Sequence, residues 1–539
     1  MKGTGASPTT HDFIVVGAGS AGCVLANRLT ADGRHSVLLL EAGPRDTNPW
    51  IHVPLGYGKL FNQPRVNWMY QSEPEPELNG RRIFTPRGKV LGGSSSINGL
   101  VYIRGQPEDF DDWETPGWSF GELLPYFKRS EDQAHGADDL HGAGGPLTVS
   151  DQSEPHELCD AFIEAAVQAG HPRNADFNGE RQEGAGYSQL TTRNGFRCST
   201  AVGYLRPARN RANLQVATEA LATRVLFAGT RATGVEYLQN GIRVTASAAK
   251  GVILSGGAIN TPQLLQLSGV GPAALLGEHG IPVVLDQPNV GEHMQDHFQV
   301  RMTLKCTRPI TLNDDMQSLW GQMKIGLRYV FLRKGPLTVS AGYAAGFWRT
   351  RPEVRRPDVQ THFLTFSLER MGEKLHPFSG FTASICQLRP TSRGSVRIRS
   401  SDPREAPAIR YNYLSTEHDR RTMVDGLKML RRILEQPAIQ PYIASEHRPG
   451  AQVQSDDGWL AYCRETGSTI YHPSCTAMMG TREPAVVDSH LRVRGLEGLR
   501  VVDASVMPAV VSGNTNAAVV AIAEKAADLI HSNSRRSTP

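Results

Sequence analysis

The stretch Phe13-Ile-Val-Val-Gly-Ala-Gly-Ser-Ala-Gly22 begins as an apolar strand and ends in a glycine-rich turn. A helical run to Leu29 follows, and then a second apolar run from Ser36 to Glu41. This order of strand, turn, helix and strand predicts a βαβ unit of the kind that binds a dinucleotide. A glycine turn that serves only packing is the alternative interpretation.

The glycines of this turn have separate tasks in a dinucleotide site. Gly17 permits the tight turn, Gly19 lets the backbone approach a pyrophosphate, and Gly22 lets the helix pack closely on the strand. The start of the helix then holds the phosphates. Glu41 lies at the end of the second strand, where an acid binds the ribose hydroxyls and disfavours a 2′-phosphate.

Two further strand-like runs, at residues 251–258 and 499–503, lead toward helical segments. Pieces of one nucleotide-binding sheet therefore occur near the start, the middle and the end of the sequence, which predicts a discontinuous domain. Residues 310–465 have a different sequence pattern from these segments, with strand-like alternation at 394–399 and loops interrupted by proline. We expect this region, together with residues 155–205, to form a domain that covers the cofactor.

Composition excludes several classes of protein. The 539 residues carry a net charge of +4 with the basic residues scattered, so no nucleic-acid partner is expected. The seven cysteines form no C-x-x-C pair, which fits a reducing compartment. A polar start that leads straight into a strand favours a cytoplasmic location. Residues 316–334 form a basic amphipathic stretch, interpreted as a helix packed on its own domain or as a peripheral contact with the inner membrane.

The segment Pro86 to Gly105 is rich in glycine and serine, so its backbone can approach a flavin closely. With four other ordered motifs it resembles the glucose–methanol–choline oxidoreductase family, most closely the choline-dehydrogenase-type alcohol dehydrogenases. The resemblance covers nearly the whole chain. Its motifs are GAGSAG at 17–22 with EAG at 41–43, GKVLGGSSSIN at 88–98, GAINTPQLLQLSGVG at 257–271, NVGEHMQDH at 289–297, and the blocks from His472 and Val501.

The resemblance implies an α/β protein, α+β overall, with FAD bound to a Rossmann-like domain. The FAD-binding domain would comprise residues 1–154, 206–309 and 466–539. The substrate domain would comprise 155–205 and 310–465 and be built on an antiparallel sheet covered by helices. Ile97 stands where some relatives attach flavin to a histidine, so we expect non-covalent FAD.

The family's cofactor contacts carry over to matching positions of this sequence. Val225 matches the residue that touches adenine, and Asp503 with Ala504 matches the turn that binds the ribityl chain. The remaining expected contacts are Gly17, Gly19, Ser20, Ala21, Gly22, Glu41, Ala42, Val90, Gly92, Gly93, Asn98, Gly99, Leu100, Val101, Asn514, Thr515 and Asn516.

Taken alone, His472 has three interpretations: a core histidine, a metal ligand paired with Cys475, or a proton acceptor. The resemblance favours the third, with Asn516 as the partner that binds the substrate oxygen. No metal is expected, because HxxxH at His293 and His297 lacks a further ligand. Cys475 stands where many relatives have glycine, either as a small wall residue or as one that shapes access to the site.

The expected activity is oxidation of a primary alcohol to an aldehyde. A base takes the hydroxyl proton while hydride passes to flavin N5, and the electrons then reach a quinone or another acceptor that is not NAD. An oxidase that uses oxygen is the first alternative, and a flavin-containing lyase or photodecarboxylase the second. The sequence leaves the particular alcohol and the oligomeric state open.

Overall fold

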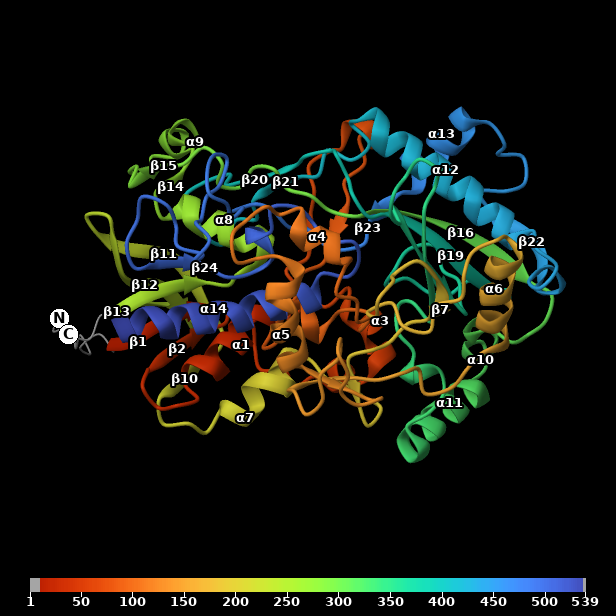
Figure 1. Cartoon of the computed structure of the whole chain (residues 1–539), viewed down its shortest axis with the longest axis horizontal. Helices are drawn as coiled ribbons and strands as arrows, with labels where there is room; N and C mark the ends of the chain where they lie inside the picture. Colours follow the sequence, from red (N-terminus) through yellow and green to blue (C-terminus); the bar gives the residue numbers. More distant parts are fainter. Residues whose placement is uncertain (1–9, 537–539) are drawn as a thin grey trace.

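The structure is a computed structural model that describes residues 10–536, with side chains to residue 532. A seven-stranded sheet carries the predicted βαβ unit at one end of the molecule (Figure 1). Strands β1, β2, β10, β13 and β24 run parallel, whereas β11, β12 and β13 form an antiparallel meander. The order is β10 (Leu214–Ala217), β2 (Val37–Leu40), β1 (Thr10–Val16), β13 (Ile242–Leu254), β12 (Arg231–Gln239) and β11 (Ala220–Ala228), with β24 (Leu499–Val501) beside β13.

Helices α1 (Ser20–Leu29) and α14 (Asn516–Arg536) pack against each other, as the red and blue ribbons in Figure 1 show. The central strands β1 and β2 are buried from Phe13 to Val16 and from Val37 to Leu40, as expected for parallel strands covered by helices. The start, middle and end of the sequence therefore meet in one sheet, which confirms the predicted α/β class.

A second seven-stranded sheet forms the other half of the molecule, and all of its strand pairs are antiparallel. Helix α12 (Glu417–Leu434) packs against β19, and α6 (Glu157–Gln168) packs beside it. The order is β22 (Ile443–Arg448), β16 (Phe298–Cys306), β19 (Gly380–Gln387), β18 (Val359–Leu364), β17 (Ala344–Trp348) and β7 (Gly184–Tyr187), with β23 (Ser468–Thr469) beside β16.

Two strands of this sheet come from segments that the sequence division placed with the FAD-binding domain. Strands β16 and β23 fall within 206–309 and 466–539, yet they pair with each other in the second sheet. Strand β16 follows the motif at 289–297 directly, so the chain crosses between the sheets there rather than near residue 309. The two-domain division itself stays a prediction.

The remaining elements are short or peripheral. The helices are α2 (Pro49–His52), α3 (Tyr57–Leu60), α4 (Pro107–Asp111), α5 (Phe120–Ser130), α7 (Arg206–Ala208), α8 (Gly257–Leu267), α9 (Ala273–Glu278), α10 (Leu312–Met316), α11 (Leu319–Leu332) and α13 (Asp456–Thr466). The strand pairs are β3 (Tyr70–Gln71) with β4 (Phe84–Thr85), β5 (Glu131–Gln133) with β6 (Leu147–Val149), β8 (Thr192–Arg193) with β9 (Phe196–Arg197), β14 (Val270–Gly271) with β15 (Leu285–Asp286), and β20 (Ser395–Arg397) with β21 (Ala408–Arg410).

The amphipathic stretch 316–334 begins at Met316, the last residue of α10, and contains one further helix, α11. Ser318 caps α11 by accepting a hydrogen bond from Gly321 N, so that helix begins at Leu319. It buries Gly321, Ile325 and Tyr329 and exposes most of its other apolar side chains. None of the helices between residues 10 and 536 is long and apolar enough to span a bilayer. Peripheral membrane contact stays a prediction.

The close packing of α1 on β1 gives a test of the fold. A Cβ at Gly22 would lie 1.9 Å from the carbonyl oxygen of Gly17. We expect Gly22→Ala to lower the thermal midpoint of the apoprotein, because the contact shifts the turn at a cost of about 2 kcal/mol or more. The control Gly326→Ala lies in α11, where the added methyl meets no atom within 4 Å. It should leave the midpoint unchanged or raise it, since alanine favours a helix. An unchanged midpoint for Gly22→Ala would contradict this account.

Candidate active site

One continuous cavity connects the glycine turn of the first sheet with side chains of the second sheet. Glu41 lines one part of it, and His472 lines another. Strands β16, β18 and β19 complete the wall near His472. Seventeen of the predicted site residues line this cavity: Gly17, Gly19, Ser20, Ala21, Glu41, Ala42, Gly93, Asn98, Gly99, Leu100, Val101, His472, Asp503, Ala504, Asn514, Thr515 and Asn516.

Three predicted contacts lie behind the wall instead. Gly22 sits against Gly17 and serves packing. Gly92 has a positive φ of 86° and donates its N–H to the carbonyl of Ala18 at 2.8 Å, so it joins the two glycine loops. Val90 is fully buried in a small apolar cluster with Ile97. These residues shape the cavity without facing it.

Val225, the predicted adenine contact, does not line the cavity, and its contact with adenine stays a prediction. Val225 points into the main core, and its N–H donates to Ser268 Oγ at 2.8 Å. Ala222 lines the cavity instead. The pairing of β11 with β12 shifts between Ala222 and Arg224, and this irregularity changes which side chains face the cavity.

Glu41 is held at the end of β2 by two backbone amides. Its carboxylate accepts hydrogen bonds from Ala18 N at 3.0 Å and from Gly43 N at 2.9 Å. Burial raises the pKa of Glu41 to about 7, although these hydrogen bonds and the charge of Lys89 favour the ionised form. The carboxylate is therefore fixed in place, and its proton is in balance near neutral pH.

The cavity fits a dinucleotide at the phosphate and sugar positions. Helix α1 begins with no capping side chain at Gly19 and no acid in its first turn, so its N–H groups stay free for an anion. Ser255 Oγ and Asn514 Oδ1 line the cavity and are buried without a hydrogen-bond partner among the described residues. Buried polar atoms of this kind require a ligand or water.

Asp503 joins three elements at the predicted ribityl turn. It accepts hydrogen bonds from Gly257 N at 2.8 Å, from Thr261 Oγ1 at 2.6 Å, and from Ser505 N at 2.8 Å. The residue thus fixes the start of α8 against the strand end of β24. Ala504 follows on the cavity wall.

The protonation of His472 follows from its neighbours. A carbonyl oxygen only accepts, so His297 Nε2 donates to Leu388 O at 3.0 Å. Burial lowers the pKa of His297 to about 4, so its ring is neutral and its Nδ1 accepts. His472 Nδ1 lies 3.0 Å from that atom and must carry a proton to donate to it. Nε2 of His472 is left as a hydrogen-bond acceptor.

That acceptor nitrogen meets an amide. Asn514 Nδ2 lies 3.2 Å from His472 Nε2. The sequence prediction assigned this partnership to Asn516, but the side-chain oxygen of Asn516 accepts from Ser20 Oγ at 2.7 Å. Helix α14 begins at Asn516, which turns that side chain toward α1, whereas Asn514 lies in the preceding loop and reaches His472.

Asp296 anchors the segment that carries His472, and the sequence prediction did not single it out. Its carboxylate accepts from His472 N at 2.7 Å, from Thr469 Oγ1 at 2.5 Å, and from the hydroxyl of Tyr413. Burial raises the pKa of Asp296 to about 6. The signal was present in the motif Gln295-Asp-His297, where Asp296 and His297 both turn out to support His472.

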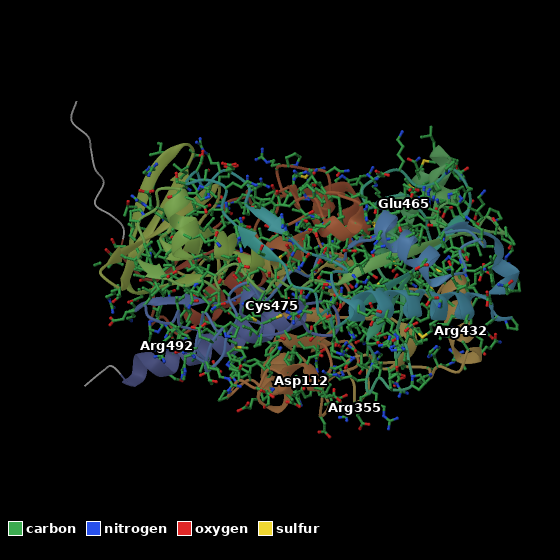
Figure 2. All side chains as sticks on the ribbon, turned by 90° about the horizontal axis from the view of Figure 1, so that it is seen from above. Asp112, Arg355, Arg432, Glu465, Cys475 and Arg492 are labelled. Carbon is green, nitrogen blue, oxygen red and sulfur yellow. The ribbon has the colours of Figure 1, made fainter. Side chains whose placement is uncertain are left out.

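Cys475 lies in the core rather than on the cavity wall, well inside the molecule in Figure 2. Its backbone has a φ of 72°, a conformation that glycine adopts most easily. This explains structurally why the related sequences described above have glycine at the position. Burial raises the pKa of its thiol to about 12. Among the described residues, no group of three or more His, Cys, Asp or Glu side chains could hold a metal ion.

A cavity with a buried acid beside a glycine turn in one part and a buried histidine–amide pair in another is typical of a dinucleotide-dependent oxidoreductase. The chain belongs to the GMC oxidoreductase family, whose N-terminal and C-terminal domain profiles match residues 11–299 and 390–523. The predicted resemblance is confirmed.

Individual relatives agree with this assignment. The chain is 46% identical over 529 residues to an oxygen-dependent choline dehydrogenase of Pseudomonas putida strain GB-1, a match that covers 96% of this chain and 94% of that protein. It is also 46% identical to an alcohol dehydrogenase [acceptor] of Pseudomonas putida, covering 96% and 95%. A formate oxidase structure from Aspergillus oryzae, studied for FAD modification, superposes with a TM-score of 0.91 at 26% identity and covers 98% and 100%. FAD is the cofactor of this chain.

Glu41 gives a test of cofactor binding that depends on pH. Ribose hydroxyls donate most strongly to an ionised carboxylate, so FAD should bind more tightly above pH 7 and more weakly as the pH falls below it and Glu41 takes up a proton. We expect Glu41→Gln to weaken binding at pH 8 about 10-fold, in line with the loss of about 1.5 kcal/mol of charged hydrogen bonding. It should also remove this pH dependence.

The Kd of FAD is measured by titrating FAD into the apoprotein at pH 6 and at pH 8. The quenching of flavin fluorescence reports the binding. Glu219→Gln is the control. Glu219 has an exposed carboxylate and lies close to Glu41, because its backbone N–H donates to the carbonyl of Gly43. Equal affinity of wild type and Glu41→Gln at pH 8 would remove Glu41 from the site.

Proposed function

We propose that this protein oxidises a primary alcohol to an aldehyde, with His472 as the base and Asn514 as the group that binds the alcohol oxygen. The observation that carries the proposal is the 3.2 Å contact between His472 Nε2 and Asn514 Nδ2 on the cavity wall. One atom can accept a proton and the other can donate a hydrogen bond. An alcohol oxygen that lies beside this pair, within hydrogen-bond reach of both nitrogens, meets both requirements of its oxidation.

His472 is set to accept a proton at neutral pH. Burial lowers its pKa well below the ordinary value, and the nearby His297, His362 and Arg87 lower it further. The imidazole is therefore neutral, and the contact with His297 places its proton on Nδ1. Nε2 then takes the hydroxyl proton directly.

Asn514 stabilises the negative charge that develops on the alcohol oxygen. Its amide nitrogen donates a hydrogen bond, whereas a carboxylate at the same place would repel a forming alkoxide. The supporting segment is fixed by Asp296, which holds the backbone N–H of His472. FAD, when bound, supplies the acceptor for the hydride that leaves the carbinol carbon.

The names of the relatives support two electron acceptors. One relative is called oxygen-dependent, and another is called an alcohol dehydrogenase with an unspecified acceptor. We propose a quinone or another acceptor that is not NAD, with oxygen as the second candidate. Comparing the reoxidation rate of reduced enzyme by air with the rate by a soluble quinone separates the two.

The role of His472 is tested by its removal. We expect His472→Ala to retain FAD and to reduce the rate of flavin reduction by at least about 100-fold, the usual loss on removing a general base. Stopped-flow bleaching of flavin absorbance under anaerobic conditions, with a panel of primary alcohols, measures this rate. His490→Ala, at an exposed histidine, is the control and should react like wild type. A wild-type flavin that stays oxidised with every alcohol of the panel would overturn the proposed function.

His297 is proposed as a positioning residue that sets the tautomer of His472. His297→Leu removes the acceptor for His472 Nδ1–H, so the imidazole can place its proton on Nε2 and lose its base function. We expect flavin reduction about 10- to 100-fold slower, with a changed pH profile. His297→Asn keeps an acceptor near the position of Nδ1 and should recover most of the rate.

A purely structural role of His297 predicts a different pattern. Both variants would then lose stability, while their pH profiles would keep the wild-type shape. Thermal midpoints measured beside the pH profiles distinguish the two cases.

A further inference from the structure

Beyond His472, the cavity wall is formed by a row of polar side chains on the second sheet. Arg301 on β16 is the direct cross-strand partner of Ser384 on β19. Ser384 is in turn the direct partner of His362 on β18. All three line the cavity, together with Gln299, which precedes Arg301 by two residues and donates from Nε2 to Ser384 Oγ at 2.9 Å. Side chains two residues apart on a strand share a face, so this row faces one space.

Both ring nitrogens of His362 are buried in this space without a hydrogen-bond partner among the described residues. Its side chain is 3% exposed. Buried polar atoms are nearly always paired in native proteins, because an unpaired one costs about 1–3 kcal/mol. A ligand that reaches His362 is therefore expected.

Arg301 brings a charge that the protein does not neutralise. Within the part of the chain that the structure describes, its guanidinium forms no ion pair with a carboxylate. Its neighbours are Tyr57 and Tyr471, whose hydroxyls burial keeps neutral by raising their pKa values, and His362, whose pKa burial and the charge of Arg301 lower to about 3. A guanidinium in such a place is suited to bind an anion with planar geometry.

The acids of the cavity lie elsewhere and are already engaged. Among the described lining residues only Glu41 and Asp503 carry carboxylates. The carboxylate of Glu41 accepts hydrogen bonds from backbone amides beside the glycine turn. The carboxylate of Asp503 accepts from the backbone N–H groups of Gly257 and Ser505.

A second guanidinium, Arg87, also lines the cavity and donates to Tyr471 O at 2.6 Å. The charge of Arg87 interacts with buried Asp296 behind His472, whereas Arg301 has no ion-pair partner among the described residues. Arg301 therefore gives the part of the cavity near His472 a positive charge.

We propose that the alcohol oxidised here carries a carboxylate, which Arg301 binds with His362 while its hydroxyl lies at His472. The substrate class is a short hydroxycarboxylate. This inference rests on the proposed function and narrows it. A quaternary ammonium such as choline would face Arg301 without a compensating acid, so the chain differs in substrate from the relatives named for choline.

The reaction uses the chemistry already described. The hydroxyl proton moves to His472 Nε2, a hydride leaves the carbinol carbon for bound FAD, and the carboxylate stays unchanged through the step. The product is an aldehyde that still carries its carboxylate. Arg301 acts by orienting the alcohol and takes up no proton.

Matched alcohols test the charge requirement on wild-type holoenzyme. Anaerobic flavin reduction is measured with 4-hydroxybutanoate and its neutral amide, and with choline and its neutral isostere 3,3-dimethylbutan-1-ol. We expect the ratio of the limiting reduction rate to the apparent Kd to be at least about 10-fold higher for the acid than for the amide, since a charged hydrogen-bonded pair contributes about 1.5–3 kcal/mol. Choline should react more slowly than its isostere.

The possible outcomes separate this inference from the proposed function. If neutral alcohols bleach the flavin but choline reacts faster than its isostere, or the acid no better than the amide, the anion site is overturned and alcohol oxidation stands. If no alcohol of the panel bleaches the flavin, the proposed function fails. Butanoate binding can be measured without turnover. The shift of flavin absorbance on adding butanoate reports its Kd.

The second experiment removes the guanidinium group of Arg301. Arg301→Gln should lower the preference for acid over amide to near unity and weaken butanoate binding by at least about 10-fold. Lys305→Gln removes a positive charge from the same strand, outside the cavity lining, and should keep the wild-type preference. An Arg301→Gln enzyme that still prefers the acid would overturn the assignment. If that variant does not fold, the wild-type comparison decides alone.

Discussion

Backbone touches backbone where the two glycine loops meet. Gly92 donates to the carbonyl of Ala18, and a Cβ on Gly93 would lie 2.7 Å from the Cα of Gly19. No side chain could stand between the loops, so the segment that begins at Gly88 is seated directly on the βαβ unit. That contact sets where Asn98 to Val101 lie and thereby where the second sheet can approach. The cavity owes its continuous shape to this seating.

Neutral histidines make proton transfer compatible with a buried site. His297, His362 and His472 all lie in the low-dielectric interior, and burial lowers the pKa of each ring. A charged imidazolium would need a carboxylate partner there, and the nearest acid, Asp296, is occupied by hydroxyl and amide donors. An incoming molecule thus meets the guanidinium groups of Arg301 and Arg87 beside the uncharged rings of His362 and His472.

Much of the fold could be predicted from the sequence, because alternation of apolar runs with glycine turns is a local signal. Most of the residues predicted to bind FAD line one cavity, because their motifs are local signals as well. The structure differs where local geometry decides between neighbouring residues: Ala222 rather than Val225 lies on the cavity wall beside a strand irregularity, and Asn514 rather than Asn516 contacts His472. The support from His297 could not be predicted, since it depends on a contact across 175 residues. The row of Arg301, Ser384 and His362 likewise exists only after three strands have paired.

The discontinuous first sheet also has a consequence for biosynthesis. Ser20 and Asn516 meet across 496 residues, and β24, the last of the described strands in chain order, completes the sheet beside β13. Chains emerge from the ribosome in order at about 5–20 residues per second, so the glycine turn is exposed for tens of seconds before its last partners arrive. The cavity for FAD cannot close during that time. The cavity can therefore close around FAD only after Asn516 has been synthesised and has reached Ser20.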